Sequence, residues 1–583
     1  MKEMFTRWTD LVDESCPLPD YPRPQLVRND WQNLNGRYDF AVRKIGEPAP
    51  ENYESEIIVP FAPESFLSGV GRTVEPDDCL WYRRYFTLNE SYKNKRILLH
   101  FEAVDHHAAV FINGTHVGEH IGGYLPFSFD ITELLIPGEN ELVVSVTDPT
   151  DAGNQDRGKQ VRRSKGFWYT ATSGIWQTVW LEPVGDVYIK DLVFTPDIDS
   201  SRIGIKTVCE GNALIKAIIK DGDDIVFAGN IEPESGVLLK NMKLWSPEDP
   251  FLYDIAVALC SQEGTILDVV TSYFGMRKFN VGYDDSAVPR LFLNNRPYFQ
   301  NGLLDQGYWP DGGMTPPTDE AMIFDIESAK ELGFNMLRKH IKIEPRRWYY
   351  HCDKLGMIVW QDMVCGADNI NMLLVGLLPN MGICKVKDDN YKLFGVSSRR
   401  CRELHERSVF ETVDALRSYP CISCWVIFNE GWGQFDAARI ADEVKSYDPT
   451  RIVDHASGWH AQGGRELKSV HRYIVPVTMP KADGRPFVLS EFGGYSRIIE
   501  NHVWNRKKSF GYVMYKTKAA LTAAYERLFL KQIIPKIRKG LSATVYTQIS
   551  DVEFEVNGLY TYDRDMLKIV ADTIKRINSQ MTL

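Results

Sequence analysis

The chain has 583 residues, of which 44% are hydrophobic and 25% are charged, and these proportions exclude a disordered or fibrous protein. At 66.7 kDa it buries enough surface to fold without disulfides or a structural metal. The net charge of −11 argues against nucleic acid, because duplex-binding proteins carry a basic face. No apolar run is long enough to span a membrane, the N-terminus has no apolar leader, and the scattered cysteines are typical of reduced thiols. We therefore predict a cytoplasmic protein with no nucleic-acid or membrane partner.

Residues 1–185 contain short apolar runs that are broken by turn signals. Arg96–Phe101 and Glu141–Val146 are two of these runs, and Asn113-Gly114 between further apolar residues is a type I′ hairpin signal. Residues 186–278 continue the same pattern with about seven short runs, which is the size of an immunoglobulin-like domain. The first half of the chain is therefore predicted to form two consecutive β-sandwiches.

Over residues 279–583, strand-like runs alternate with helical patterns such as Asp319–Leu332. Eight such runs predict a (β/α)8 barrel, in which the fifth and sixth units are short of helix. Met363–Arg400, after the third run, is too long for a plain connection, and two roles are open for it: to cap the pocket, or to form a homodimer or higher homo-oligomer. The eight runs are Tyr298–Leu303, Phe334–Lys339, Met357–Asp362, Ile422–Asn429, Ile452–His455, Ser469–Ile474, Phe487–Glu491 and Ala543–Ile549.

Two of the barrel runs end in glutamate. The fourth run leads into Asn429-Glu430 and the seventh into Ser490-Glu491, and each glutamate is followed by glycine or aromatic residues. Barrel chemistry takes place at the carboxyl ends of the strands, so strands four and seven would bring these side chains together across the mouth. One strand-end glutamate is most often a solvated loop residue or an ion-pair partner, but two in matched contexts indicate a site.

Two carboxyl groups that flank a pocket are what glycoside hydrolysis requires. One must be protonated to donate to the leaving oxygen, and the other must be ionised. A separation of about 5–5.5 Å gives a covalent intermediate and retention, whereas about 6.5–9.5 Å leaves room for water and gives inversion. The negative charge of one glutamate raises the pKa of the other, which keeps the acid protonated.

At these residues the chain resembles glycoside hydrolase family 2, the family of β-galactosidases, β-glucuronidases and β-mannosidases. In the first domain the resemblance rests on LNGRYDF, LWYRRYF, VFINGTHVGEHIGGYLPFSFDIT and SGIWQTVWLEPV, which are similar to the family's sugar-binding jelly roll. LWSPEDPFLYDI and YFGMRKF resemble the end of its immunoglobulin-like domain. In the barrel, GFNMLRKHIKIEPRRWYYHCDKLGMIVWQD, WVIFNEGWGQFD and VLSEFGGYS match in the correct order.

The resemblance implies a retaining mechanism and assigns roles by position. Glu430 corresponds to the acid/base, Glu491 to the nucleophile, and Asn429 to the asparagine that binds the sugar 2-hydroxyl. Tyr473 takes the place of a tyrosine beside the nucleophile. The family's strand two reads Asn-x-x-Arg-x-x-His; here Arg338 fits, but the histidine comes one residue early, as His340.

Strand eight departs further, because Gln548 follows where the family often has a tryptophan; Gln548 or Asp551 is predicted to make a polar contact instead. Asn505-Arg506-Lys507 fits the Asn-x-Lys pattern that β-glucuronidases use for the sugar carboxylate, but nearer to Glu491 than the family places it, and so short a pattern occurs by chance.

The remaining candidates lie at other strand ends. Asp362 either accepts from a sugar hydroxyl or pairs with Arg338, and His455 and Trp459 either contact sugar or pack at the barrel rim. Cys421 and Cys424 form a CxxC without a second pair at zinc-ligand spacing, so they are predicted to be buried packing residues. No metal and no cofactor are predicted.

We therefore expect a retaining exo-β-glycosidase that acts on small or oligosaccharide glycosides, with β-galactosides as the first substrates to test. The alternatives within the family are a β-glucuronidase or an enzyme for mannosides, glucosides or arabinosides. The alternative of another class is a carbohydrate-binding protein without activity, and hydrolysis of any aryl β-glycoside would separate the two classes.

Overall fold

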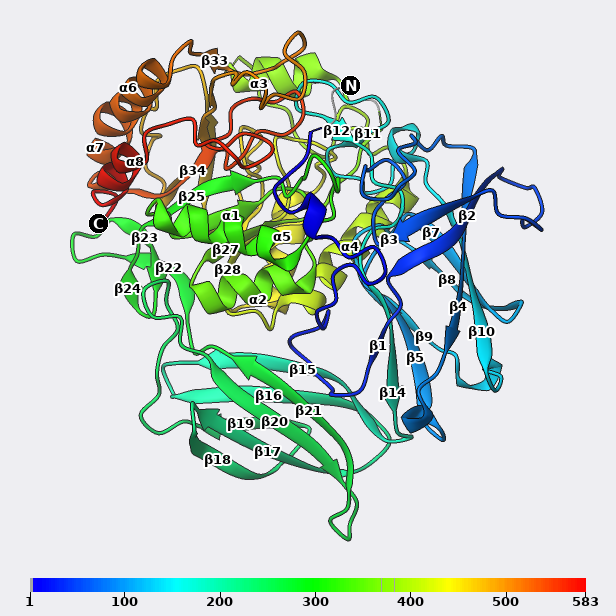
Figure 1. Cartoon of the computed structure of the whole chain (residues 1–583). Coiled ribbons are helices and arrows are strands. Elements are labelled where there is room, and N and C mark those ends of the chain that lie inside the picture. Colours follow the sequence, from blue (N-terminus) through cyan, green and yellow to red (C-terminus); the bar gives the residue numbers. More distant parts are fainter. Residues whose placement is uncertain (1–3, 369, 382) are drawn as a thin grey trace.

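The computed structural model describes residues 4–368, 370–381 and 383–583, which form two β-sandwiches and a barrel (Figure 1). The first sandwich lies to the right in this view, the second lies below, and the barrel occupies the upper left. This arrangement confirms the predicted fold class.

The first sandwich pairs a four-stranded sheet with a six-stranded sheet. Between β7 (His107–Ile112) and β8 (Thr115–Ile121), Asn113 and Gly114 have φ angles of 49° and 77°, as the predicted type I′ turn requires. The smaller sheet contains β1 (Gln32–Asn33), β14 (Val179–Val184), β5 (Arg96–Phe101) and β9 (Phe127–Asp130). The larger sheet contains β3 (Ser55–Val59), β2 (Gly36–Lys44), β4 (Asp78–Thr87), β10 (Glu139–Thr147), β7 and β8.

The second sandwich has the seven strands that the sequence indicates, divided between two antiparallel sheets. Alternate side chains of its strands are buried, so both sheets contribute to one apolar core. One sheet contains β15 (Tyr188–Asp197), β16 (Arg202–Glu210) and β19 (Glu234–Leu238). The other contains β18 (Asp224–Ile231), β17 (Leu214–Asp221), β20 (Tyr253–Cys260) and β21 (Ile266–Phe274).

The barrel is an eight-stranded parallel sheet in which each predicted run forms a strand. Neighbouring strands pair along the whole order except between the fifth and the sixth, so the barrel is nearly closed. These two strands are also the ones for which the sequence lacked helical patterns. The strands are β25 (Gln300–Asp305), β26 (Met336–Lys339), β27 (Ile358–Asp362), β28 (Ile422–Val426), β29 (Ile452–Asp454), β30 (Lys468–Arg472), β31 (Phe487–Gly493) and β34 (Leu541–Thr547).

The helices begin and end at residues with the expected chemistry. The Thr318 hydroxyl accepts from the Ala321 amide at the start of α1 (Asp319–Glu331), and Gly356 ends α2 (Arg346–Leu355) in the left-handed region. The further helices are α3 (Leu378–Asn380), α4 (Arg399–Leu416), α5 (Ala437–Tyr447), α6 (Lys518–Leu528), α7 (Ile534–Ile537) and α8 (Ala571–Asn578). None of the described helices is long and apolar enough to cross a membrane.

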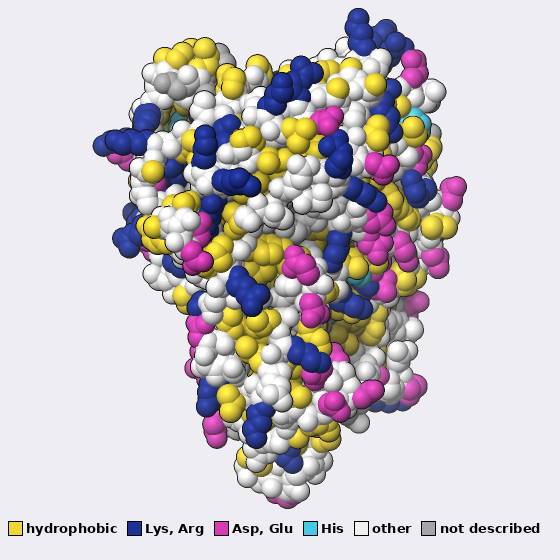
Figure 2. Space-filling model, turned by 90° about the vertical axis from the view of Figure 1, so that its left-hand side faces the viewer, with side chains coloured by type: hydrophobic (Ala, Val, Ile, Leu, Met, Phe, Trp, Pro, Cys, Tyr) yellow, Lys and Arg dark blue, Asp and Glu magenta, His cyan; other side chains and the backbone are white. Residues whose placement is uncertain are grey.

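Acidic and basic side chains are interspersed over the face that Figure 2 shows, and hydrophobic side chains gather near its centre. This mixture agrees with the modest excess of acidic over basic residues in the sequence.

Asp353 on α2 joins the second sandwich to the barrel. Its carboxylate accepts from the Tyr273 hydroxyl at 2.8 Å and from the Cys421 amide at 2.7 Å, and the Trp245 indole donates to its backbone carbonyl at 2.8 Å. The side chain is fully buried, and burial raises the pKa of Asp353 to about 7.

This carboxyl makes stability depend on pH. The folded protein holds the proton more tightly than the unfolded chain, so the stabilising contribution is complete below about pH 4 and is lost as the pH rises through 7. Asp353→Asn keeps an acceptor but does not titrate. The free energy of unfolding of this variant should therefore change less between pH 4 and 7 than that of the wild type, and the difference should be on the order of 4 kcal/mol at most. Urea unfolding at several pH values measures this, and identical pH profiles for the two proteins would contradict it.

Candidate active site at the mouth of the barrel

Glu430 and Glu491 meet at the carboxyl ends of β28 and β31. Glu430 follows the strand in the left-handed region, with a φ of 53°, and its amide donates to the Ser457 carbonyl at 2.8 Å. One carboxylate oxygen of each glutamate and one ring nitrogen of His471 all lie within 4.8 Å of one another. The Glu430 side chain is 17% exposed and that of Glu491 only 4%, so one carboxyl faces the mouth and the other lies deeper.

His471 on β30 connects the two carboxyl groups. Its Nδ1 lies 2.8 Å from Glu430 Oε1, and its Nε2 lies 3.6 Å from Glu491 Oε1. Sequence reasoning did not select this residue. The sequence nevertheless contained a signal for His471. Side chains two residues apart on a strand share a face, and His471 comes two residues before the candidate Tyr473.

A chain of hydroxyl groups determines which nitrogen of His471 carries the hydrogen. The Ser457 hydroxyl donates to Ser490 Oγ at 3.0 Å, so it accepts from His471 Nε2, which lies 2.7 Å away. In the neutral ring this leaves Nδ1 as an acceptor, and the group that faces it is Glu430.

Arg338 on β26 lies at the base of the site, and its guanidinium is fully buried. It binds both oxygens of Asp362 at 2.8 and 2.9 Å, and it donates to Glu491 Oε1 at 3.1 Å. It also donates to Asn429 Oδ1 at 2.9 Å, which directs the Asn429 amide hydrogens away from the guanidinium. Of the two roles considered for Asp362, the structure has the ion pair with Arg338.

The surroundings of Glu491 keep its carboxyl ionised. Burial raises its pKa, but the positive charges of His471, when protonated, and of Arg338 outweigh burial and lower the pKa to about 2. The Tyr473 hydroxyl also donates to Glu491 Oε2, and the Tyr473 ring stacks on Tyr512 with ring centroids 4.0 Å apart.

The structure brings some of the other candidates into the site. His340 Nδ1 lies 2.8 Å from Asp362, although its backbone position differs from the family pattern. Trp459 packs edge-to-face against His471 at 5.7 Å.

Three candidates have their described contacts elsewhere. His455 accepts from the Gln462 amide at 3.2 Å and packs against Gly464, which is the rim-packing alternative. Gln548 accepts from Gln306 at 2.7 Å and donates to Asn557 at 2.9 Å. Asp551, the other strand-eight candidate, pairs with Lys568. A strand-end position predicted that these side chains lie near the mouth, but it did not fix their partners.

The first sandwich contributes a wall that the sequence did not predict. Trp168 stacks on Trp432, with ring centroids 4.4 Å apart, and Phe167 contacts Phe510 at 5.6 Å. Trp432 comes two residues after Glu430, so these rings lie beside that glutamate.

Glycines allow the loops that form this wall to approach closely. A Cβ on Gly366 would lie 1.8 Å from the Gln155 carbonyl oxygen, and one on Gly433 would lie 2.4 Å from the Gly366 carbonyl oxygen. The loop of the first sandwich, the loop after β27 and the loop after β28 therefore pack backbone against backbone.

The long segment Met363–Arg400 lies against the loop after β29. The Val375 carbonyl accepts from the Trp459 indole at 3.0 Å and from His460 at 2.5 Å, and the Gln462 side chain donates to the Val386 carbonyl at 2.9 Å. Asn369 and Gly382 of this segment lie outside the described residues.

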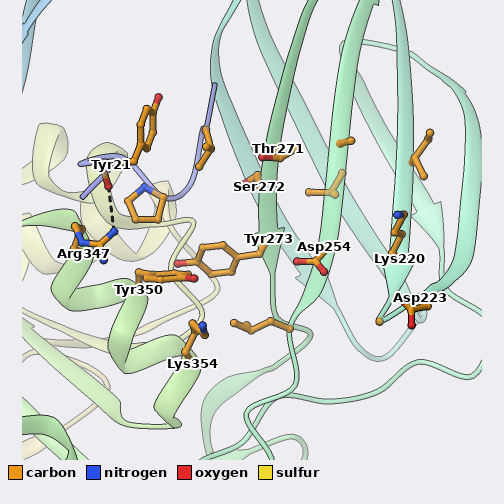
Figure 3. Close-up of a pocket in the computed structure, with 17 residues that line it drawn as sticks. Tyr21, Lys220, Asp223, Asp254, Thr271, Ser272, Tyr273, Arg347, Tyr350 and Lys354 are labelled. Atoms are coloured by element: carbon orange, nitrogen blue, oxygen red, sulfur yellow. Dashed lines mark hydrogen bonds between the residues drawn. The ribbon is translucent and has the colours of Figure 1, made fainter. Parts of the chain in front are cut away.

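A groove of about 800 Å³ lies away from this site, between α2 and the second sandwich (Figure 3). Tyr273 and Tyr350 point toward each other across it, with ring centroids 5.3 Å apart, and Arg347 bonds the Tyr21 carbonyl. None of the residues that line it belongs to the Glu430–Glu491 pair.

Two weaker sequence signals, the CxxC pair and the Asn-x-Lys pattern, have no contact with the two glutamates among the described residues. Cys421 and Cys424 are buried free thiols, in agreement with a packing role. Asn505 accepts from the Lys507 and Lys508 amides of its own turn, and Lys507 is exposed.

Three family models match the chain in domain order. The sugar-binding domain of glycosyl hydrolases family 2 matches residues 62–183, the middle domain of that family matches 187–277, and its TIM barrel domain matches 289–480. Together these matches cover more than two thirds of the chain.

The curated relatives include β-galactosidases and putative β-glucuronidases. A β-galactosidase from Thermoanaerobacter pseudethanolicus is 28% identical over 440 residues, which are 71% of this chain and 53% of the relative. A putative β-glucuronidase from Formosa agariphila is 27% identical over 440 residues, which are 72% of this chain and 51% of that protein. The chain thus spans about half the length of these relatives.

Solved structures match nearly the whole chain. β-D-Glucuronidase from Dictyoglomus thermophilum superposes with a TM-score of 0.74 at 18% identity, covering 96% of this chain and 98% of that one. A β-galacturonidase from Eisenbergiella tayi bound to galacturonate gives 0.71 at 19% identity, covering 96% and 99%. At this level of identity the likeness establishes the fold alone.

Arg338→Met should raise the pKa of Glu491 by at least about one unit, because it removes a positive charge in direct contact with the carboxylate. Carbon-13 NMR of glutamate-labelled protein measures this, and the signal that disappears in Glu491→Gln identifies the residue. Arg347→Met, on the outer face of α2, is the control and should leave the signal unchanged. An unaltered Glu491 titration in Arg338→Met would contradict the assignment.

Proposed function

The chain belongs to glycoside hydrolase family 2, and from this membership we propose that it is a retaining exo-β-glycosidase. The observation that carries the proposal is the approach of Glu430 and Glu491, whose nearest ligand oxygens lie within 4.8 Å. That approach agrees with the short carboxyl separation of retaining enzymes, about 5–5.5 Å, and is shorter than the separation of about 6.5–9.5 Å with which an inverting enzyme makes room for water.

In the first step Glu491 attacks the anomeric carbon while Glu430 gives its proton to the leaving oxygen. The contacts of each carboxyl support this division, because Arg338 and Tyr473 stabilise the charge on Glu491, whereas Glu430 faces the unprotonated nitrogen of His471. The bond from the anomeric carbon to the aglycone breaks, and a glycosyl ester forms on Glu491.

In the second step the ester is hydrolysed. Glu430, now ionised, removes a proton from water as the water attacks the anomeric carbon, and Glu491 leaves as a carboxylate. The configuration at the anomeric carbon is thus inverted twice and retained overall. Asn429 supports binding throughout, because its amide is held by Arg338 with its hydrogens free for the sugar 2-hydroxyl.

The surrounding loops support an exo-acting pocket for the end of a glycoside. The ring pair of Trp168 and Trp432 borders it, and Val375 ties Met363–Arg400 to Trp459, which supports the capping role for this segment. Two sugars are candidates: β-galactosides, as the sequence suggested and as several relatives are named, and β-uronides, as other relatives and the solved structures are named.

Glu491→Gln should lower kcat by at least about 1,000-fold, because an amide does not act as the nucleophile. A 2-deoxy-2-fluoro glycoside with a good leaving group should label the wild type, since the fluorine slows the second step more than the activated first step. Peptide mass spectrometry is expected to find the label on Glu491. Label on any other carboxylate would refute the assignment.

Glu430→Ala should affect substrates unequally. Aryl glycosides with acidic leaving groups need no proton in the first step, so for these the second step becomes limiting. Azide should then restore turnover by attacking the glycosyl-enzyme and should yield a β-glycosyl azide, which NMR identifies. Equal losses for good and poor leaving groups without azide rescue would show that Glu430 is not the acid/base.

A further inference from the structure

We propose that Lys159, from the first sandwich, is the residue that selects a carboxylate on the substrate sugar, so that the enzyme acts on β-uronides. The inference deepens the proposed glycosidase function and rests on it. Lys159 is 8% exposed, and its ammonium faces the rings of Tyr169, Trp432 and Phe167 at 5.4, 5.9 and 6.0 Å.

Close backbone packing fixes the position of Lys159 at the mouth of the barrel. Gly158 has a φ of +60°, and a Cβ there would lie 2.6 Å from the carbonyl oxygen of Ile341. The amide of Gly158 donates to the Cys365 carbonyl at 3.0 Å, and the Arg157 guanidinium donates to the Ala367 carbonyl at 2.8 Å. The lysine is thus held between the loops that follow β26 and β27.

Two neighbours place its charge near the end of the barrel that holds the two glutamates. Trp432, one of its aromatic walls, is two residues after Glu430. The second neighbour is His340. Burial lowers the pKa of His340 well below its usual value, and the positive charge of Lys159 lowers it further. His340 contacts Asp362, which pairs with the guanidinium that holds Glu491.

The other buried lysines show what Lys159 lacks. Lys339 lies 2.6 Å from Asp305 and 2.8 Å from Glu344, Lys342 lies 2.9 Å from Glu344, and Lys568 pairs with Asp551. Among the described residues, no carboxylate lies within ion-pair distance of Lys159, and no hydrogen bond from its ammonium is present.

A buried cation without an anionic partner loses hydration that aromatic faces replace only in part. A carboxylate from the substrate would complete the site with a charge-assisted hydrogen bond. A C6 hydroxyl in the same position would gain much less, because it carries no charge. The selected ligand is therefore the carboxylate of a uronide, whether glucuronide or galacturonide.

The test compares matched 4-nitrophenyl glycosides that differ only at C6: β-glucuronide with β-glucoside, and β-galacturonide with β-galactoside. The wild type should prefer a uronide over its neutral partner by about 100-fold or more in kcat/KM. Lys159→Met keeps the apolar stem without the charge and should reduce this ratio by about 100-fold, whereas Lys159→Arg should keep most of it. Lys165→Met, an exposed lysine of the same loop, should leave the ratio unchanged.

The outcomes separate this inference from the proposed function. Hydrolysis of the neutral glycosides in preference to the uronides, or an unchanged ratio in Lys159→Met, would overturn the inference and leave the glycosidase intact. Calorimetric binding of glucuronate and glucose to Glu491→Gln requires no turnover. Binding of glucuronate that depends on Lys159, without hydrolysis of any glycoside by the wild type, would support the inference and contradict the function.

Discussion

The guanidinium of Arg338 is the group on which the arrangement of the site depends. It is fully buried, and its donors reach Asp362 on β27, Asn429 after β28 and Glu491 on β31, so one side chain ties four strands together across the barrel. Two carboxylates at this depth would each lose several kcal/mol of hydration without a cation. The same contacts orient the amide of Asn429 and fix the position of Glu491.

From this arrangement follows the difference between the two glutamates. Glu491 is deep, bound by a permanent cation and by a phenol, whereas Glu430 is closer to the opening and forms a hydrogen bond with the imidazole of His471. Two chemically identical side chains thereby lie in different surroundings, and those of Glu491 lower its pKa. In the proposed mechanism this difference in environment gives Glu491 the role of nucleophile and Glu430 that of acid/base.

The barrel and the pairing of its glutamates could be predicted because both depend on local patterns. Apolar runs marked all eight strands, and parallel strand ends meet at one edge, which brought Glu430 and Glu491 together although they are 61 positions apart in the sequence. His471 was also within reach, since strand alternation places it on the same face as Tyr473. The gap between β29 and β30 corresponds to the two units that lacked helical patterns.

Other features depend on contacts between distant segments, which no local pattern reports. Lys159 and Trp168 belong to the first sandwich, and their place beside Trp432 follows from backbone packing at Gly158 and Gly366. Gln548 directly follows the eighth strand, β34, as predicted. Its side chain, however, forms hydrogen bonds with the side-chain amides of Gln306 and Asn557. The proposed specificity thus depends on how the domains dock, whereas the proposed chemistry depends on the barrel.

The stereochemistry of the product tests the central claim most directly. Proton NMR during hydrolysis of an aryl β-glycoside shows which anomer of the free sugar forms before mutarotation mixes the two. Two displacements through Glu491 predict that the β anomer appears first. Initial release of the α anomer would mean a single displacement by water, and it would contradict the roles assigned to Glu430 and Glu491.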